Sequence, residues 1–523
     1  MQSAVDLSGR PIHFIGIGGI GMSALAHILL QRQLPVSGSD VRTNRITQHL
    51  QALGAHIFSQ QSAANIEQLC QAAGSHRTSI NAHSFAHPPQ NNSRQPKPQA
   101  TFSPSPLPCT VPQIICSTAI HDDNLEYQAA VASGCPIFHR SDVLAALIQE
   151  FPNSIAIAGT HGKTTTSSLI GYLLFKAKLD PTIIVGGEVA AWGGNARIGE
   201  SSYLVAEADE SDGSLVKFLP QIGVITNIEL DHPDHYSALE QVVEIFQQFV
   251  EHCQTMIVCV DCPTITDQLL ATAIPVPLIT YGVDPSARAD YTVEHIAYTG
   301  DGTTVQVLEH GKILGQLQLQ LLGQHNLSNA LAAVAVGRYL GLDFRVIADA
   351  LSTFTGTKRR FETYGEAQGI TFVDDYAHHP SEIQATLAAA RLQANAMAVK
   401  YLQSRVIAVF QPHRYSRVKT FLAEFSQSFP EADLVVVTDI YSAGEANPDN
   451  LQGQGVADAI ALHHPTVTCQ RTLANVVDFL QAHLQSGDVV LFLGAGDLNR
   501  IIPQVLAHYQ SLPCSPSPEV VLQ

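Results

Sequence analysis

The chain has 523 residues, a length that predicts three or four domains. Its 28 Lys and Arg are outnumbered by 46 Asp and Glu, which gives a net charge of -18, and no basic cluster is available to follow a nucleic-acid backbone. No apolar run is long enough to span a membrane and the first residues, MQSAVDLSGR, lack the apolar core of an export signal, so we expect a cytoplasmic protein that does not bind nucleic acid.

The predicted elements begin with a strand at Ile12 to Ile15, followed by the glycine run Gly16-Ile-Gly18-Gly19-Ile-Gly21 and a helical pattern from Met22 to Leu30. A second strand near Pro35 to Ser37 ends close to Asp40, about twenty residues beyond the glycines. This order predicts a Rossmann-like start, in which a diphosphate binds at a helix N-terminus. Because NAD and UDP-sugars both carry a diphosphate, the pattern alone leaves both ligands open.

A strand at Val111 to Ile120 and a helix at Asn124 to Ser133 continue the first module, predicted for residues 1–150. Between the two halves of this module, residues 75–110 are rich in Pro, Ser, Asn, Gln and His and nearly devoid of apolar side chains. Such a segment buries too little apolar surface to offset the entropy lost on ordering. It is therefore predicted to be a disordered surface insertion, and its histidines are interpreted as solvated residues rather than metal ligands.

The second module, predicted for residues 151–357, opens with the strand and loop SIAIAGTHGKTTT, from Ser154 to Thr166. Glycines in such a loop let backbone N–H groups face nucleotide phosphates, while Lys163 can reach the β- and γ-phosphate oxygens and Thr164 can hold Mg2+. The spacing departs from the common P-loop, since the earlier glycine position is Ile157 inside the strand. The loop predicts an ATP site.

Two acidic segments follow the next predicted strands of this module, Ser202 to Asp209 and Ile222 to Ile228. An ATPase needs carboxylate or imidazole ligands for Mg2+ at the ends of strands beside its phosphate loop, and Glu207 and His232 are placed for that. Farther along, period-two alternation predicts antiparallel hairpins over Tyr291 to Leu322, before a final helix. The nine cysteines contain a single CxxC pair, so neither a disulfide framework nor a zinc site is expected.

The third module, predicted for residues 358–523, restarts the α/β alternation with strands at Ile370 to Val373, Val406 to Phe410, Leu434 to Val437 and Val489 to Leu493. Three polar clusters follow its strands: DDYAHHPSE, QPHRYSR and GAGD. Ligands of open α/β sheets bind beyond the carboxyl ends of the strands. These clusters are therefore the expected contribution of the third module to the site.

Nine motifs in one order resemble the ATP-dependent Mur ligases of cell-wall synthesis: HFIGIGGIGMS, AGTHGKTTT, EADESDGS, TNIELDHPDHY, GQHNLSNALAA, KRRFE, DDYAHHPSE, QPHRYSR and GAGD. The resemblance runs from about His13 to Arg500, apart from the insertion. It implies a three-domain α/β fold, with a Rossmann-like domain, a P-loop ATPase domain and a second Rossmann-like domain. Within the family the motifs are most similar to the branch that uses ATP and Mg2+ to join L-alanine to UDP-N-acetylmuramate, a step of peptidoglycan synthesis that supports cell shape and division.

The resemblance also implies roles for individual residues. The UDP-sugar would bind at Gly16, Gly18, Gly19, Gly21 and Asp40. The metal would bind at Thr164, Glu207 and His232. ATP would contact Gly159, Thr160, His161, Gly162, Lys163, Thr164, Thr165, His325, Asn329, Arg360 and Asp375. L-Alanine would bind at Tyr376, His378, Arg414 and Arg417, where paired guanidinium groups suit a carboxylate. The implied catalytic set is Lys163, Glu207, His232, Arg360, His378, Arg414 and Arg417.

The implied chemistry explains why ATP is needed. A carboxylate is a poor electrophile at neutral pH, so γ-phosphoryl transfer would first form an acyl phosphate, which the amine of L-alanine then attacks. A closely similar ligase that attaches a murein tripeptide to UDP-N-acetylmuramate, and a nucleotide-driven switch without ligase chemistry, are the alternatives that stay open. An NAD-dependent dehydrogenase is a more remote one, because the downstream ATP motifs favour UDP in the glycine loop. The oligomeric state is not predicted.

Overall fold

The structure is a computed structural model that describes residues 4–42, 44–75, 111–286, 288–300, 302–398, 401 and 404–513. The insertion predicted for residues 75–110 lies outside the described residues apart from its first position. Two compact units divide the chain, Met1–Leu147 and Ile148–Gln523. Within the described part, none of the helices combines the length and apolar character that a membrane crossing requires.

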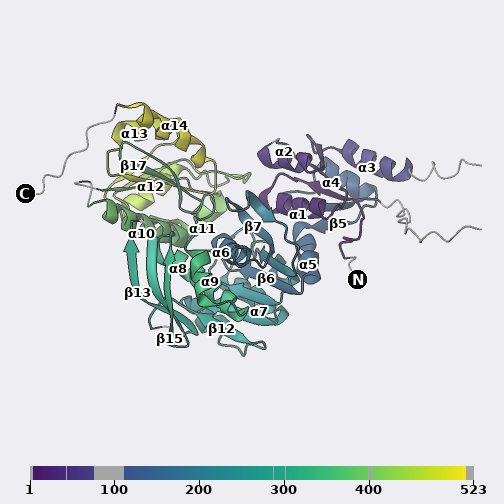
Figure 1. The fold of residues 1–523 in the computed structure, drawn as a ribbon. Helices are drawn as coiled ribbons and strands as arrows, with labels where there is room; N and C mark the ends of the chain where they lie inside the picture. Colours follow the sequence, from purple (N-terminus) through teal and green to yellow (C-terminus); the bar gives the residue numbers. More distant parts are fainter. Residues whose placement is uncertain are drawn as a thin grey trace, which may run out of the picture. The chain divides into compact units, whose positions relative to one another are not determined.

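The first unit contains a five-stranded parallel sheet in the order β3-β2-β1-β4-β5 (Figure 1). The strands are β1 (Ile12–Ile15), β2 (Val36–Ser39), β3 (His56–Phe58), β4 (Gln113–Cys116) and β5 (Ile137–His139). The helices are α1 (Ile20–Gln31), α2 (Arg45–Ala52), α3 (Ala63–Ser75), α4 (Leu125–Ala132) and α5 (Arg140–Glu150). The strand order reverses between β1 and β4, which is where Rossmann-like sheets bind ligands, and the predicted glycine run follows β1.

The second unit contains a ten-stranded sheet in the order β15-β14-β13-β12-β11-β10-β6-β9-β7-β8. Its parallel strands are β6 (Asn153–Ala158), β7 (Thr182–Val189), β9 (Tyr203–Glu207), β10 (Ile222–Ile225), β11 (Thr255–Cys259) and β12 (Leu278–Tyr281). The appended antiparallel strands are β8 (Gly194–Arg197), β13 (Tyr291–Thr299), β14 (Gly302–Glu309) and β15 (Lys312–Leu319). The predicted α/β class with antiparallel additions is thereby confirmed. Strand β6 lies between β9 and β10, so the two acidic segments flank the phosphate loop.

Helices α6 (Lys163–Lys176), α7 (Leu239–His252), α8 (Gln324–Tyr339) and α9 (Phe344–Leu351) accompany this sheet. The first turns of α6 and most of α8 are buried, because α6 packs against both α8 and α9. This packing fixes the helix that starts at the phosphate loop. Short helical turns lie at η1 (Ser214–Lys217) and η2 (Ile265–Leu269).

The second unit also contains a six-stranded sheet in the order β16-β17-β21-β18-β19-β20. Its strands are β16 (Glu362–Ala367), β17 (Ile370–Asp375), β18 (Val406–Phe410), β19 (Leu434–Val437), β20 (Val467–Cys469) and β21 (Val489–Leu493), all parallel except β16. The helices are α10 (Pro380–Met397), α11 (Tyr415–Ser426), α12 (Gly453–Ala461), α13 (Leu473–His483), η3 (Leu498–Ile501) and α14 (Ile502–Ser511).

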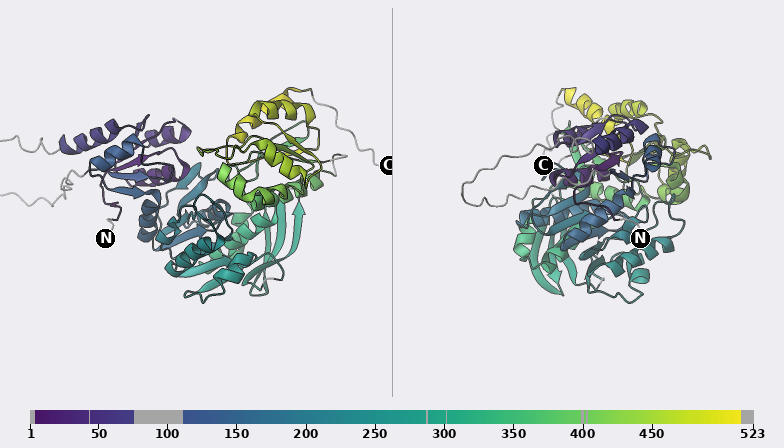
Figure 2. Two further views of the ribbon diagram at one scale, coloured as in Figure 1. Left: turned by 180° about the vertical axis from the view of Figure 1, so that it is seen from behind. Right: turned by 90° about the vertical axis from the view of Figure 1, so that its right-hand side faces the viewer.

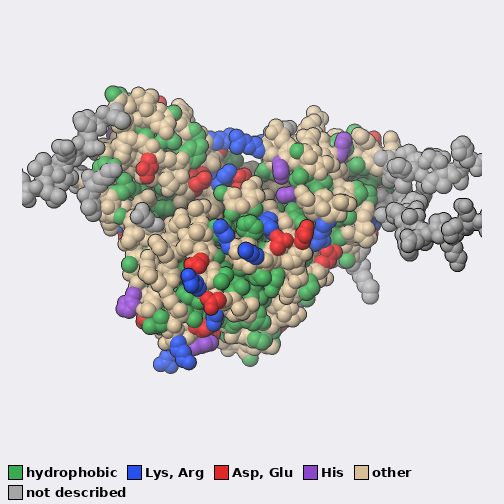
Figure 3. Space-filling model, in the orientation of Figure 1, with side chains coloured by type: hydrophobic (Ala, Val, Ile, Leu, Met, Phe, Trp, Pro, Cys, Tyr) green, Lys and Arg blue, Asp and Glu red, His purple; other side chains and the backbone are tan. Residues whose placement is uncertain are grey.

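Apolar cores cover both faces of the six-stranded sheet. Side chains of α10, α11 and α12 pack on one face and those of α13 and α14 on the other, and Figure 2 shows these yellow-green helices around the sheet. Strand β13 of the larger sheet runs up to α10 and contacts this helix, which covers one face of the six-stranded sheet (Figures 1 and 2). On this unit, the face shown in Figure 3 carries basic side chains beside acidic ones rather than a patch of one sign.

A buried polar network holds the centre of the first unit together. The His13 and Glu126 side chains are fully buried, and His13 Nε2 lies 2.9 Å from Glu126 Oε1. Asn65 Nδ2 donates to the same carboxylate oxygen at 2.7 Å, and the Ser39 hydroxyl donates to its other oxygen. Because these four residues come from β1, β2, α4 and the segment carrying α3, one carboxylate ties the sheet to its helices.

Replacing Glu126 by Ala is expected to destabilise the first unit by about 3–5 kcal/mol, because His13 Nε2 would stay buried without its partner and Asn65 and Ser39 would each lose a hydrogen bond. The measurement is native-state amide exchange of peptides covering β1 and β2, which reports local opening in this unit. The control is Glu67→Ala, which removes an exposed glutamate from α3 of the same unit. Equal protection in both variants would show that the network contributes nothing to stability.

Candidate active site

The phosphate loop connects β6 to α6 through two glycines that no other residue can replace without strain. Gly159 has φ of +135° and Gly162 has φ of +80°. A Cβ atom on Gly159 would lie 2.0 Å from Thr226 Oγ1, and one on Gly162 would lie 2.6 Å from Asn329 Oδ1. The loop is therefore shaped by the end of β10 on one side and by α8 on the other.

The end of β10 also fixes the middle of the loop. The His161 backbone N–H donates to Asn227 Oδ1 at 2.8 Å, and the His161 carbonyl accepts from Thr226 Oγ1 at 2.6 Å. Thr160 Oγ1 accepts the backbone N–H of Glu229 at 2.8 Å. The loop thus has a defined backbone conformation, which is what a cradle for phosphates requires.

Lys163 is held inside its own loop. Its Nζ donates to the carbonyls of Gly159 and Thr160 at 2.6 and 3.0 Å and pairs with Glu210 Oε2 at 2.8 Å. Burial disfavours the charged ammonium, but the nearby carboxylates of Glu210 and Asp209 outweigh it and raise the pKa of Lys163. Sequence reasoning missed Glu210 as the partner of the lysine, although it lies within the EADESD motif.

The predicted metal ligands lie beside this lysine. Thr164 Oγ1 donates to Glu207 Oε1 at 2.9 Å, so the structure brings these two residues together at the start of α6. His232 Nε2 lies 4.0 Å from Glu210 Oε1 and 3.7 Å from Asp231 Oδ2. Burial lowers the pKa of His232, which favours the neutral imidazole that a metal ion needs. A hydroxyl and carboxylates form the oxygen-rich set that suits Mg2+.

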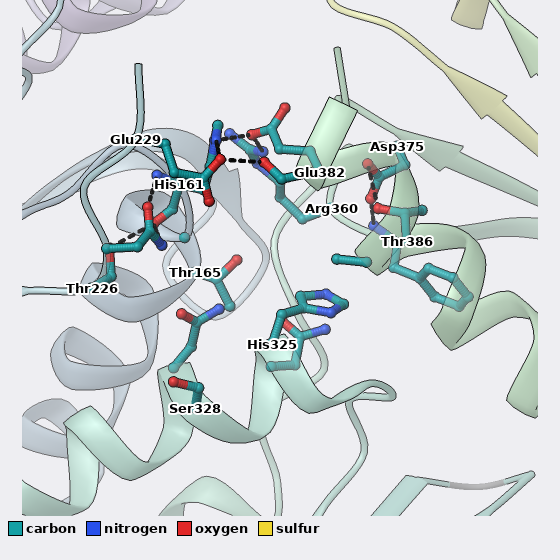
Figure 4. A pocket seen from close by; sticks show the side chains of 17 residues that line it. His161, Thr165, Thr226, Glu229, His325, Ser328, Arg360, Asp375, Glu382 and Thr386 are labelled. Atoms are coloured by element: carbon teal, nitrogen blue, oxygen red, sulfur yellow. Dashed lines mark hydrogen bonds and ion pairs between the residues drawn. The ribbon is translucent and has the colours of Figure 1, made fainter. Parts of the chain in front are cut away.

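A cavity of about 210 Å³ opens next to the loop (Figure 4). Its walls come from the phosphate loop, the end of β10, α8, the turn before β16, the end of β17 and the start of α10. The predicted ATP contacts that line it are His161, Gly162, Thr165, His325, Asn329, Arg360 and Asp375. The predicted contacts Gly159, Thr160, Lys163 and Thr164 lie in the adjoining loop. The lining residues that sequence reasoning missed include Thr226, Asn227, Glu229, Ser381, Glu382 and Thr386.

Arg360 and Asp375 bring the third predicted module to this cavity. Asp375 is buried at the end of β17 and accepts the backbone N–H groups of Phe361 at 2.6 Å and Ala377 at 2.7 Å. Burial raises the pKa of Asp375 to about 6. The Arg360 guanidinium lies over the Tyr376 ring, 5.1 Å from its centroid. Asp375 therefore shapes the turn that carries Arg360.

The predicted alanine-binding residues form a group, but their guanidinium groups already have partners. Arg417 Nε and Nη2 donate to Asp231 Oδ1 at 3.0 and 2.9 Å, and both side chains are at most 5% exposed. Arg414 Nη1 pairs with Asp234 Oδ2 at 2.6 Å. The His378 ring lies between those of Tyr376 and His413, at 5.2 and 5.8 Å.

The predicted UDP-sugar loop lies in the first unit, directly after β1. Gly16 has φ of +83°, and the backbone N–H of Gly18 donates to Asp40 Oδ2 at 2.8 Å. A Cβ atom on Gly21 would lie 3.2 Å from Arg140 Nη1. The structure therefore brings Asp40 to the glycines as predicted by spacing, and it adds an arginine at the start of α5 that the sequence analysis missed.

Buried histidines make the stability of the second unit depend on pH. Burial lowers the pKa of His325 to about 4, and burial together with the Arg417 charge lowers that of His378 to about 3. An unfolded histidine has a pKa of about 6.5. Between this pH and the lower pKa of the folded histidine, the folded chain binds fewer protons than the unfolded chain. This contribution to stability is complete above pH 6.5 and declines as the pH falls toward 4.

We expect the free energy of unfolding to fall between pH 6.5 and 4.5, with each such histidine contributing up to about 1.4 kcal/mol per pH unit. His325→Gln should make the slope shallower, whereas the exposed His463→Gln should leave it unchanged. The free energy of unfolding of each variant is measured at each pH by denaturant unfolding, followed by the fluorescence of Trp192, the single tryptophan. Parallel curves for wild type and His325→Gln would exclude a buried neutral histidine at this position.

Three family models match the chain in the order of its modules. They are "Mur ligase family, catalytic domain" at residues 11–152, "Mur ligase middle domain" at residues 157–337, and "Mur ligase, glutamate ligase domain" at residues 359–496. Among curated proteins, the UDP-N-acetylmuramate–L-alanine ligase of Acaryochloris marina is 69% identical over 523 residues and covers all of both chains. The ligase of the same name from Nostoc sp. is 58% identical and covers 97% of this chain and 98% of its own.

Solved structures show the same relationship. The UDP-N-acetylmuramate-alanine ligase of Thermotoga maritima superimposes with a TM-score of 0.73 at 26% identity, covering 96% of this chain and 99% of its own. A murein peptide ligase from Psychrobacter arcticus, at 21% identity, shares the fold with a TM-score of 0.65 and covers 97% of this chain and all of its own. With its three matched domains and its full-length relatives, the chain belongs to the Mur ligase family.

Proposed function

We propose that this chain is an ATP-dependent ligase that joins L-alanine to the carboxylate of UDP-N-acetylmuramate and releases ADP and phosphate. The observation that carries the proposal is the 69% identity, over the whole chain, to a relative with that name. The phosphate loop, the adjoining cavity and the cluster of arginines in the second unit support it. The reaction supplies a peptidoglycan precursor, and a cytoplasmic location follows from its use of ATP and a UDP-sugar.

We propose that the three domains are those given by the sequence, residues 1–150, 151–357 and 358–523, each with its own sheet. The glycine loop after β1, with Asp40, would bind the UDP-sugar, and Arg140 beside Gly21 adds a positive charge that suits a diphosphate. The cavity between α8 and β17 would bind the adenosine of ATP. Its phosphates would then extend along the loop toward Lys163.

The proposed chemistry has two steps. The muramate carboxylate attacks the γ-phosphorus of ATP, which forms an acyl phosphate and ADP, and the alanine amine then displaces phosphate from the acyl carbon. Lys163 would stabilise charge on the transferring group once it exchanges Glu210 for phosphate oxygens, and Arg360 would contribute a second positive charge. Thr164 and Glu207, with His232 nearby, would hold Mg2+, which neutralises phosphate charge when bound. The reaction relies on positioning and charge rather than on a covalent enzyme group.

The alanine carboxylate would bind between Arg414 and Arg417, with Tyr376 and His378 beside it. Asp231 occupies the edge of Arg417 formed by Nε and Nη2, so the alanine carboxylate would meet Nη1, which also contacts His413. Nη1 lies 3.4 Å from His413 Nδ1 at this end of the site. Asp231 would thus orient Arg417 for its ligand.

The proposal is tested by phosphate release from ATP in the presence of UDP-N-acetylmuramate, with and without L-alanine. We expect turnover that requires both substrates and yields UDP-N-acetylmuramoyl-L-alanine by mass spectrometry. Turnover with the murein tripeptide but not with alanine would identify the recycling ligase instead. ATP hydrolysis that does not depend on either acceptor would identify a nucleotide switch.

Lys163→Ala should lower kcat by roughly 10^2-fold or more, because it removes a charge aimed at the transferring phosphoryl group.

Arg414→Ala is expected to raise the KM for L-alanine by about tenfold or more while leaving the KM for ATP nearly unchanged, because the guanidinium would meet only the amino-acid carboxylate. Arg414 is the better test than Arg417, whose removal would leave the buried Asp231 unpaired. The matched control is Arg391→Ala, which removes an arginine of α10 that pairs with Asp433 at 2.7 Å. A large change in the KM for ATP with alanine unaffected would assign Arg414 to the nucleotide.

A further inference from the structure

Two histidines and a glutamate converge at the rim of the nucleotide cavity, apart from the Thr164–Glu207 pair. They are His161 of the phosphate loop, Glu229 after β10, and His379 immediately before α10, and one ligand atom from each lies within 4.8 Å of the others. His161 Nε2 is 3.6 Å from Glu229 Oε2, and the two imidazole rings lie 4.7 Å apart. Figure 4 shows Glu229 and Glu382 beside His161 at this rim.

The Nδ1 atoms of both histidines already have partners. His161 Nδ1 lies 3.2 Å from Glu382 Oε1, and His379 Nδ1 lies 2.8 Å from Ser381 Oγ. The Ser381 hydroxyl donates to Glu229 Oε2 at 2.8 Å, so it can accept the proton of His379 Nδ1. Metal-binding histidines characteristically donate their second ring N–H to a carboxylate or another acceptor in this way.

The Nε2 atoms of His161 and His379 are both buried, and neither has a hydrogen-bond partner among the residues that the structure describes. A buried polar atom without a hydrogen-bond partner destabilises the fold. A ligand bound by both Nε2 atoms and the carboxylate would satisfy the two nitrogens together. Two imidazoles and one carboxylate form a set that zinc and similar ions bind with a fourth position left for water. Mg2+ prefers oxygen ligands, so the Thr164–Glu207 pair and this cluster differ in the ion they suit.

We propose that His161, Glu229 and His379 form a binding site for a divalent transition-metal ion of the zinc class. The ion would join the phosphate loop to the first turn of α10, and so link the two sheets of the second unit across the rim of the nucleotide cavity. Glu382 and Ser381 would orient the two imidazoles. The position of His161 is fixed before any ion binds, because its backbone N–H donates to the Asn227 side chain.

The test uses Co2+ as a spectroscopic probe, added to the metal-stripped full-length protein in excess Mg2+ so that oxygen-rich sites are filled. We expect one Co2+ per chain with visible absorption typical of low coordination number, displaced by stoichiometric Zn2+. His379→Ala should abolish the absorption. Glu229→Gln, which keeps the shape of the side chain, should weaken Co2+ at least about tenfold, a loss typical even of outer partners of a metal site.

Two control variants locate the ion. His232→Ala removes the histidine of the proposed Mg2+ side, and Cys259→Ser removes a thiol of the CxxC pair that lies 3.5 Å from Ser328 Oγ. Both should keep the Co2+ spectrum. The thermal midpoint should rise with Zn2+ in wild type and in these controls, and at the same Zn2+ concentration it should rise less in Glu229→Gln. Because Glu229→Gln keeps the shape of the side chain, it serves as a second variant in case His379→Ala misfolds. Absence of a Co2+ band in wild type, or a band that survives both His379→Ala and Glu229→Gln, would overturn the proposal.

Discussion

The buried ion pair between Asp231 and Arg417 joins the two halves of the second unit. Asp231 follows β10 of the ten-stranded sheet, and Arg417 lies in α11 beside the six-stranded sheet. Two charges that are at most 5% exposed can stay ionised only as a pair, and removing one of them costs about 3–5 kcal/mol because the other is left buried. The relative position of the nucleotide cavity and the arginine cluster therefore depends on this contact.

Acidic residues on either side of Asp231 also pair with polar groups beside the six-stranded sheet. Glu229 accepts a hydrogen bond from the Ser381 hydroxyl, and Asp234 pairs with Arg414, so three acidic residues of one loop contact the N-terminal ends of α10 and α11. His232 differs from them, since its φ of +55° places it in the left-handed region and its ring lies near Glu210 beside the phosphate loop. A strained residue of this kind persists only where its surroundings hold it. One short loop thus contacts both the phosphate end and the amino-acid end of the site.

The sequence predicted those parts of the site that depend on local pattern. The strand, glycines, Lys163 and Thr164 occur within thirteen residues, and the clusters after β9, β10, β17 and β18 lie beyond strand ends, where parallel sheets gather ligands. The partners of these residues were not predictable in the same way. Glu210 meets Lys163 because β9 lies next to β6, and Arg417 meets Asp231 across 186 positions of sequence. Short strands such as β3, β5 and β20, with three residues each, carry too few positions to show a period.

The paired charges also bear on how the site would engage its substrates. Lys163 is bound by Glu210 and by two carbonyls of its own loop, while Arg414 and Arg417 are bound by Asp234 and Asp231. A phosphate that takes over Lys163, or a carboxylate that takes over Arg417, must leave the displaced Glu210 or Asp231 with a new partner, since an unpaired buried charge is costly. A divalent cation near Thr164 and Glu207 would offset such acids on the phosphate side. Because Asp231 is adjacent to His232 and pairs with Arg417, this one carboxylate connects the phosphate end of the site to the group proposed to receive the amino acid.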